Sequence, residues 1–334
     1  MDVTVAKQIA VVSLGGTISM TEASTGGIVP TLSGEELVKR FGLDDPAIEI
    51  SPLSLRQLAS AQLAAEDLVA VSRKTHELAE AGAAGIVVTQ GTDTIEETAF
   101  ALDLIGTKTI PVVVTGAMRH PNAPGSDGAA NFRDAVMVAA SPDAATLGAT
   151  VVLDGEIHAA RYLIKGNTAT VRAFRSSPIG QVGWAQEGAV FLSARTLEPT
   201  LPRISLPSGE LPEVAVLKAA LGDDGRLAET LPALGYAGVI VEGMGGGHVH
   251  PAMADRLEKL AAGMPVIIST RVVGSHVLRS TYGFVGSEID LFRRGMMLGG
   301  WLTSGKLQLL LKFLLAAGAG QHEIRQALQS FGGS

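Results

Sequence analysis

Apolar residues recur along the chain in two patterns, one typical of buried strands and the other of amphipathic helices. Short β-branched runs have the length of strands, whereas longer segments repeat their apolar positions about every three to four residues. The strand pattern occurs at 86–89, 110–114, 151–153, 239–241 and 266–269, and the helical pattern at 66–81, 129–140 and 251–262. Because strands alternate with helices, the sequence predicts an α/β fold with a parallel sheet covered by helices on both faces.

One further helix is predicted directly after the strand at 86–89. Asp93 or Thr94 is expected to cap it, and its apolar positions continue to Leu104. Glu96 and Glu97 fall in its first turn, where the helix dipole favours acidic side chains. This segment therefore predicts a strand, a tight turn and a helix in close succession.

A dense group of helix- and strand-breaking residues interrupts the alternation near residue 200. It comprises Pro199, Pro202, Pro207, Ser208, Gly209 and Pro212. Such a cluster is typical of a linker, and 334 residues are enough for two domains. We therefore predict an N-terminal α/β domain over 1–195, a linker over 196–212 and a C-terminal α/β domain over 213–334.

Composition and charge restrict the function. The net charge of −7 argues against nucleic acid or an anionic membrane as a partner. The absence of cysteine excludes disulfides, thiolate catalysis and cysteine-based metal sites. The apolar run 307–317 is too short for a membrane span and predicts a buried helix. Since the N-terminal residues also lack the pattern of a signal peptide, we expect a cytoplasmic protein without membrane contact.

Two threonines lie in glycine-containing turns that follow predicted strands. Thr17 ends the run Ile9-Ala-Val-Val-Ser-Leu-Gly-Gly-Thr17, and Thr92 follows Ile86-Val-Val-Thr-Gln-Gly. The carboxyl ends of strands are where open α/β sheets bind their ligands, and glycines let the backbone come close to a ligand. Two hydroxyls at such positions, one followed directly by Asp93, indicate covalent chemistry on a small carbonyl substrate.

These segments resemble the motifs of the bacterial-type L-asparaginases. The motifs are Gly15-Gly-Thr-Ile18, Gln90-Gly-Thr-Asp-Thr-Ile-Glu-Glu-Thr98, Val113-Val-Thr-Gly-Ala-Met-Arg119, Ser126-Asp-Gly-Ala-Ala-Asn131 and Lys165-Gly-Asn-Thr168. The second is long and specific, and the likeness in order and spacing covers nearly the whole chain. It implies a larger N-terminal α/β domain with flavodoxin-like winding and a smaller C-terminal α/β domain.

The resemblance also implies roles for four residues. A threonine hydroxyl is a weak nucleophile unless a neighbouring group takes its proton, and a lysine whose pKa is lowered by burial can do so. Thr92, Lys165 and Asp93 occupy the positions of the family's triad, with Asp93 also holding the substrate's α-ammonium group. Thr17 is the implied nucleophile, although the sequence leaves open which threonine attacks first.

Substrate contacts are implied at five further positions. Backbone N–H groups near Thr92 and Ala117 are candidates to stabilise an oxyanion, while Gly16, Gly91 and Ser60 would line the substrate carboxylate. His248 takes the place of an asparagine that the neighbouring subunit contributes to the amino group. Separately, the segment Asp127–Asn131 is expected to begin a helix and form the floor of the site.

The chain departs from the family's pattern in three places. The loop 20–27 lacks the tyrosine that the family carries there, and Glu22 or Thr25 are the candidates to replace it. His248 stands in the Gly-rich stretch where the family has asparagine. No carboxylate occurs in Ser275–Arg279, where the partner subunit's acidic residue is expected. These changes predict intact hydrolytic machinery and an altered pocket for the α-amino group.

Three functions are compatible with these residues. The first is an asparaginase-type amidohydrolase that converts L-asparagine to aspartate and ammonia through an acyl-enzyme. The second is an amidase of the same family for another small amide or imide, and the third is a non-catalytic module that binds a small ligand. The resemblance implies a homotetramer built as a pair of dimers. No cofactor or metal is implied, since His248 and His250 lack a third ligand nearby.

Overall fold

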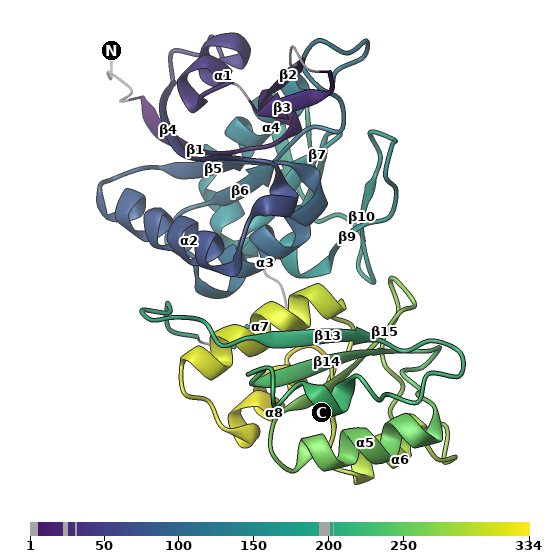
Figure 1. Cartoon of the computed structure of the whole chain (residues 1–334). Coiled ribbons are helices and arrows are strands. Elements are labelled where there is room, and N and C mark those ends of the chain that lie inside the picture. Colours follow the sequence, from purple (N-terminus) through teal and green to yellow (C-terminus); the bar gives the residue numbers. More distant parts are fainter. Residues whose placement is uncertain (1–5, 23–25, 31, 194–200, 203) are drawn as a thin grey trace. The chain divides into compact units, whose positions relative to one another are not determined.

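The computed structural model describes residues 6–22, 26–30, 32–193, 201–202 and 204–334 (Figure 1). The chain divides into two compact units, Met1–Glu198 and Pro199–Ser334, and we describe each by itself. The division falls inside the predicted linker 196–212, of which residues 196–200 and 203 lie outside the described residues.

The first unit is built on a sheet of eight strands. Their order is β12-β11-β8-β7-β6-β5-β1-β4. The strands are β1 (Lys7–Gly15), β4 (Ile48–Leu58), β5 (Gly85–Thr89), β6 (Val112–Thr115), β7 (Thr150–Leu153), β8 (Glu156–Ala159), β11 (Gly183–Gln186) and β12 (Ala189–Leu192). Two short antiparallel ribbons accompany it, β2 (Met20–Glu22) with β3 (Ile28–Pro30) and β9 (Leu163–Lys165) with β10 (Phe174–Ser176).

Five strands of this sheet are parallel and give it flavodoxin-like winding. Strand β1 pairs with β4 on one side and β5 on the other, and β6 and β7 follow in turn. In the order in which the five occur along the chain, the arrangement is 2-1-3-4-5, as in flavodoxin-like folds. The connections change direction between β1 and β5, and ligands bind at the carboxyl ends of strands beside such a point.

The remaining strands of the sheet were not part of the prediction. β7 turns back into β8, which pairs with it antiparallel, and β11 and β12 continue the sheet in the same way. The sheet is therefore mixed rather than purely parallel. These additions lie on the β7 side, away from the change of direction at β1 and β5.

Helices cover both faces of this sheet, as predicted (Figure 1). They are α1 (Gly34–Phe41), α2 (Ala65–Glu80), α3 (Ile95–Ile105) and α4 (Gly128–Ala139). Phe41 of α1 contacts Phe132 of α4, with ring centroids 6.4 Å apart. The apolar side of α3 joins the core through Ile95, Ala99 and Leu102, which are fully buried.

The start of α3 differs from the predicted cap. A single 3₁₀ turn, Thr92–Thr94, precedes the helix, and Thr94 occupies the N-cap position without a side-chain bond to the helix. Its hydroxyl instead donates to the backbone oxygen of Ser60 over 3.0 Å. The hydroxyl of Thr94 therefore binds the neighbouring turn at Ser60 rather than the helix.

The second unit has a smaller sheet, and all four of its strands are parallel. Their order is β13-β14-β15-β16. The strands are β13 (Val214–Lys218), β14 (Gly238–Gly243), β15 (Val266–Thr270) and β16 (Met297–Leu298), and the helices are α5 (Pro251–Ala261), α6 (Glu288–Arg293), α7 (Ser304–Ala316) and α8 (Gln321–Gln329). Helix α7 contains the apolar run 307–316 and is largely buried. In the part of the chain that is described, no helix has the length and apolarity needed to cross a membrane.

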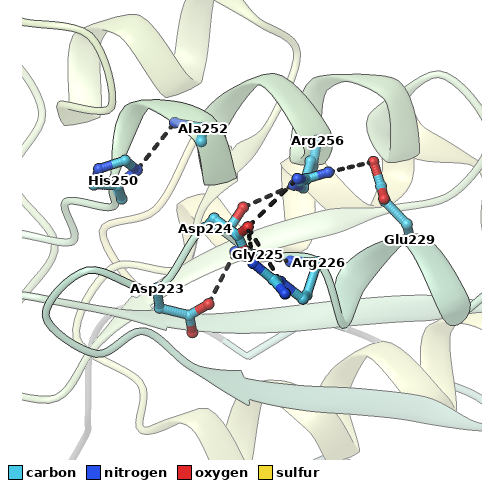
Figure 2. A network of polar contacts seen from close by, with 8 residues as sticks. All are labelled: Asp223, Asp224, Gly225, Arg226, Glu229, His250, Ala252 and Arg256. Atoms are coloured by element: carbon cyan, nitrogen blue, oxygen red, sulfur yellow. Dashed lines mark hydrogen bonds and ion pairs between the residues drawn. The ribbon is translucent and has the colours of Figure 1, made fainter.

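An ion-pair network anchors the loop after β13 to helix α5 (Figure 2). Arg256 of α5 donates to the backbone oxygen of Asp224 over 2.9 Å and to Glu229 over 2.7 Å. Hydrogen bonds from Arg226 hold the pKa of the Asp224 carboxyl far below its usual value. His250 is the N-cap of α5, where its Nδ1 accepts the N–H of Ala252 over 3.2 Å.

Candidate active site

Thr17 and Thr92 follow adjacent parallel strands of the first unit. Ser13 of β1 lies beside Thr89 of β5 in the sheet register, and each threonine comes within four residues of that point. The two turns touch, because a Cβ added to Gly16 would lie 1.8 Å from the backbone nitrogen of Gly91. Gly16 also has a φ of 85°, which L-residues rarely adopt. Glycine is therefore required where the two motifs meet.

Lys165 joins Thr92 and Asp93 in one polar cluster. Its Nζ lies 3.0 Å from Thr92 Oγ1 and 2.7 Å from Asp93 Oδ1. The Lys165 side chain is 15% exposed and that of Asp93 is 69% exposed, so the cluster opens to solvent on the aspartate side. Thr92 is buried. The contact thus joins the buried Thr92 hydroxyl to a lysine that lies 73 residues further along the sequence.

Ser60 lies beside this cluster, close to both Gly91 and Asp93. Its hydroxyl accepts the backbone N–H of Asp93 over 3.2 Å, and its backbone oxygen accepts the Thr94 hydroxyl. A Cβ on Gly91 would come within 2.6 Å of Ser60 Oγ. The 3₁₀ turn Ser60–Gln62 therefore supports the turn that carries Thr92.

The backbone of Ala117 is held in a defined orientation next to Thr92. Asn131 donates its Nδ2 to the backbone oxygen of Gly116 over 3.0 Å, and Asp127 accepts the N–H groups of Met118 and Arg119, both over 2.9 Å. Because C=O and N–H of a trans peptide point in opposite directions, the Ala117 N–H points away from Asn131. It donates to no described residue. The segment Asp127–Asn131 thus lies at the start of α4 and fixes the backbone of the loop 116–119 by hydrogen bonds.

The loop after Thr17 contains Glu22 and Thr25, the two candidates to replace the family's tyrosine. Thr25 lies outside the described residues, and nothing is described of the Glu22 side chain. Thr17 itself is half-buried, and its hydroxyl bonds to no described residue. His120 is half-buried on the loop after Ala117, with an Nδ1 that has no partner among the described residues.

His248 belongs to the second unit, where it contacts a buried carboxylate. It follows β14, and its Nε2 lies 3.0 Å from Oε2 of Glu288, whose side chain is fully buried. Burial raises the pKa of Glu288, but the N–H groups of Tyr282 and Thr281, together with His248, outweigh this effect and lower it. The rings of Tyr282 and Phe284 each meet the imidazole edge-on at 5.1 Å.

Comparison with known proteins assigns most of the chain to one family. The family model "Asparaginase, N-terminal" matches residues 8–197, and "Glutaminase/Asparaginase C-terminal domain" matches residues 213–328. The chain belongs to the bacterial-type asparaginase family. The asparaginase resemblance and the two-domain α/β fold expected from the sequence are both confirmed.

Similar asparaginases span nearly the full length of the chain. The L-asparaginase of Bacillus licheniformis is 33% identical over 93% of this chain and 96% of its own length. The glutaminase-asparaginase of Acinetobacter glutaminasificans is 28% identical over 84% of this chain and 90% of its own length. A crystal structure of a probable cytoplasmic L-asparaginase from Campylobacter jejuni matches with a TM-score of 0.87 and 27% identity, covering 97% of this chain and 100% of that one. The protein is accordingly a hydrolase that acts on amide bonds.

Two residues of this asparaginase-family chain contact predicted site residues without having been predicted themselves. Glu288 contacts His248, and Glu96 accepts the backbone N–H of Lys165. Both lie in the first turn of a helix, where the helix dipole alone favours acidic side chains. Their presence in the sequence therefore did not indicate a functional role. Among the described residues, no three His, Asp or Glu side chains are grouped as a metal site requires.

Proposed function

We propose that the protein hydrolyses the side-chain amide of L-asparagine to aspartate and ammonia. In this proposal Thr17 is the nucleophile, and Thr92, Lys165 and Asp93 manage the protons. The contact of Lys165 Nζ with both Thr92 Oγ1 and Asp93 Oδ1, at 3.0 and 2.7 Å, is the observation that carries it. A neutral amine within hydrogen-bond distance of a hydroxyl can take up its proton when the hydroxyl reacts.

The reaction would proceed in two halves. The Thr17 oxygen attacks the amide carbon, its proton passes to the departing nitrogen, and ammonia leaves as the C–N bond breaks. A water molecule then gives one proton to the Thr92–Lys165 pair and attacks the ester carbon. As the ester C–O bond breaks, the pair returns this proton to the Thr17 oxygen, which releases aspartate and restores the Thr17 hydroxyl. The N–H groups of Thr92 and Ala117 would stabilise the oxyanion in both halves, and each such donor is worth about 10²–10³ in rate.

Substrate binding would use the groups around the two turns. Gly16, Gly91 and Ser60 would line the substrate carboxylate, and the exposed carboxylate of Asp93 would hold the α-ammonium. His248 would complete this pocket from the neighbouring subunit. The family resemblance supports this role.

A second substrate class is favoured by the pairing of His248. A histidine bonded to the Glu288 carboxylate presents a different set of hydrogen-bond partners from the asparagine that the family carries there. An amidase for a small amide or imide without an α-ammonium group would fit this change. The name glutaminase-asparaginase among the relatives also makes glutamine a substrate to test.

Hydrolysis of a panel of amides, measured as ammonia release, tests both candidate functions. The panel contains L-asparagine, D-asparagine, L-glutamine, succinamic acid and a cyclic imide, with Thr17→Ala and Thr92→Ala as controls. For the cyclic imide the measured product is the ring-opened amide acid, because breaking one C–N bond of the ring releases no ammonia. We expect turnover of L-asparagine, reduced at least 10³-fold in each variant. Turnover of succinamic acid but not of asparagine would establish an amidase for substrates without an α-ammonium group. Tight aspartate binding without any turnover would instead indicate the non-catalytic module.

We further propose a homotetramer, built as a pair of dimers, in the cytoplasm. The resemblance supports the tetramer, and a relative named a probable cytoplasmic L-asparaginase supports the location. Sedimentation velocity and cell fractionation test the two statements. A fully active monomer would refute the first.

A further inference from the structure

Helix α3 carries two acidic side chains that bind the same neighbouring segment. Glu96 lies in its first turn, and Asp103 follows seven residues later, which places both on one side of the helix. Asp103 binds Arg161, and Glu96 binds the backbone of Lys165. The helix therefore holds residues 161–165 at both ends.

The Asp103–Arg161 pair, which holds the first residue of the segment 161–165, is buried and geometrically restrained. Asp103 is fully buried and Arg161 is 6% exposed, with Nε to Oδ2 at 3.0 Å and Nη2 to Oδ1 at 3.4 Å. Asp103 also accepts the N–H of Ala149 over 3.1 Å. A Cβ on Gly148 would lie 2.1 Å from Asp103 Oδ1, so a glycine is needed for this approach. The 3₁₀ turn Ala160–Tyr162 is thus fixed to α3 before strand β9 begins.

The other contact, from Glu96, binds the backbone of Lys165 itself. Oε1 of Glu96 accepts the Lys165 N–H over 2.5 Å, whereas the next N–H, that of Gly166, donates to Ala173 of the antiparallel ribbon. The carboxylate of Glu96 therefore connects the lysine backbone to α3. The lysine side chain then extends to Thr92 and Asp93, which belong to the 3₁₀ turn that precedes that helix.

We propose that Glu96 is a positioning residue that holds Lys165 over Thr92. The inference rests on the proposed function in that it takes Lys165 as catalytic. Glu96 fixes the lysine backbone relative to the helix that presents Thr92, so both members of the reacting pair share one rigid support. Precise placement matters because a misplacement of about 1 Å can lower a rate about 10²-fold.

Three single variants test this role. Glu96→Ala removes the acceptor, and we expect kcat to fall about 30- to 100-fold with KM changed less than about threefold. Glu96→Gln keeps an acceptor oxygen and should recover most of the activity. Glu66→Ala is the matched control, because Glu66 is also in the first turn of a helix but is exposed and distant in sequence. It should leave kcat unchanged.

A double variant distinguishes positioning from a general structural effect. If Glu96 acts through Lys165, Glu96→Ala combined with Lys165→Ala should be no slower than Lys165→Ala alone. Losses that multiply would overturn the proposal, as would a Glu96→Ala enzyme with kcat within twofold of the unmodified protein.

Hydrogen–deuterium exchange at the Lys165 amide supplies a readout that does not depend on catalysis. We expect Glu96→Ala to speed exchange at this amide at least tenfold, while the amide of Val113 in the central strand β6 stays unchanged. If the unmodified protein hydrolyses no amide in the panel, the proposed function fails, and exchange still decides whether Glu96 holds Lys165. Unchanged exchange at Lys165 would overturn the positioning role itself.

Discussion

Asn131 shows how one buried side chain can orient a backbone group at a candidate active site. Its Nδ2 donates to Gly116 O over 3.0 Å and to Asp127 Oδ2 over 3.1 Å, while its Oδ1 accepts the N–H of Asp154 over 2.9 Å. All three positions lie beyond the carboxyl ends of β6 and β7 or at the start of α4. The peptide that presents the Ala117 N–H is thereby fixed before any substrate arrives.

Replacing Asn131 by aspartate should therefore impair catalysis more than binding. The substitution is nearly isosteric, but it removes the donor to Gly116 O and places a carboxylate beside that oxygen. We expect kcat to fall at least about tenfold, with KM altered less, since loss of an oxyanion donor costs about 10²–10³. Kinetics with the substrate found in the panel provide the measurement. Asn122→Asp is the control, because Asn122 is exposed and its Oδ1 accepts a hydrogen bond from Arg40. Equal effects of both variants would contradict the assignment.

His158 makes the stability of the first unit dependent on pH. It is 2% exposed, and burial lowers its pKa from 6.5 to about 4, even though Glu156 lies 3.3 Å from its Nε2. The unfolded chain therefore binds a proton below pH 6.5 that the folded protein does not take up until about pH 4. Stability is consequently lost as pH falls through this window, by about 2 kcal/mol between pH 7 and pH 5.

Thermal unfolding of His158→Gln at pH 7 and pH 5 tests this dependence. We expect the decrease in midpoint between the two pH values to be smaller in His158→Gln than in the unmodified protein. His322→Gln serves as the control, because His322 is exposed on α8. A variant with an undiminished pH dependence would show that other groups cause it.

At the level of elements, the contact between the turns after β1 and β5 sets how closely the two threonines approach. Gly16→Ala would place a methyl group 1.8 Å from the nitrogen of Gly91, at a φ of 85°. We expect activity to fall at least about 10²-fold because the turns must separate. Gly82→Ala is the control that distinguishes backbone strain from a steric clash, since Gly82 has a φ of 94° but nothing within 4 Å of the added Cβ. It should lose only about 1 kcal/mol of stability and keep its activity. Full activity of Gly16→Ala would contradict the close contact.

The elements that the sequence predicted well are those whose burial dictates their composition. Strand β5 and helix α4 are examples, because every residue of β5 is buried and α4 repeats its apolar positions. Strand β4 was not predicted, since it alternates exposed and half-buried residues and contains Pro52, which is tolerated at the edge of a sheet. The antiparallel strands β8, β11 and β12 were also missed, because none of them contains the consecutive β-branched residues by which β6 and β7 were predicted.

The same distinction applies to the candidate site. Thr17 and Thr92 could be predicted because each directly follows a strand, and local sequence determines that geometry. The contacts of Glu96 with Lys165 and of Asp103 with Arg161 span 69 and 58 residues, so no local pattern encodes them. The clustering of Thr92 with Lys165 was predicted only from the family resemblance.

At the level of the whole molecule, the second unit exposes apolar side chains beside His248. Tyr282 and Phe284 contact the imidazole and are 45% and 50% exposed, and Val285 is 48% exposed. Val272 and Val273, on the loop after β15, are similarly exposed. Single exposed apolar residues are common on protein surfaces, but a contiguous group is typical of an interface. The aromatic cluster of His248, Tyr282 and Phe284 is therefore the surface that we expect a second copy of the chain to cover.

Phe284→Glu tests this expectation, because a charge in a covered apolar surface is costly to bury. We expect sedimentation velocity to show species smaller than the proposed tetramer, with a fall in specific activity that follows the loss of assembly. Leu221→Glu is the matched control, since Leu221 is 96% exposed in the same unit. It should leave both assembly and activity unchanged. A Phe284→Glu protein that remains fully assembled would show that this cluster faces solvent, and dissociation without loss of activity would show that each chain carries a complete site.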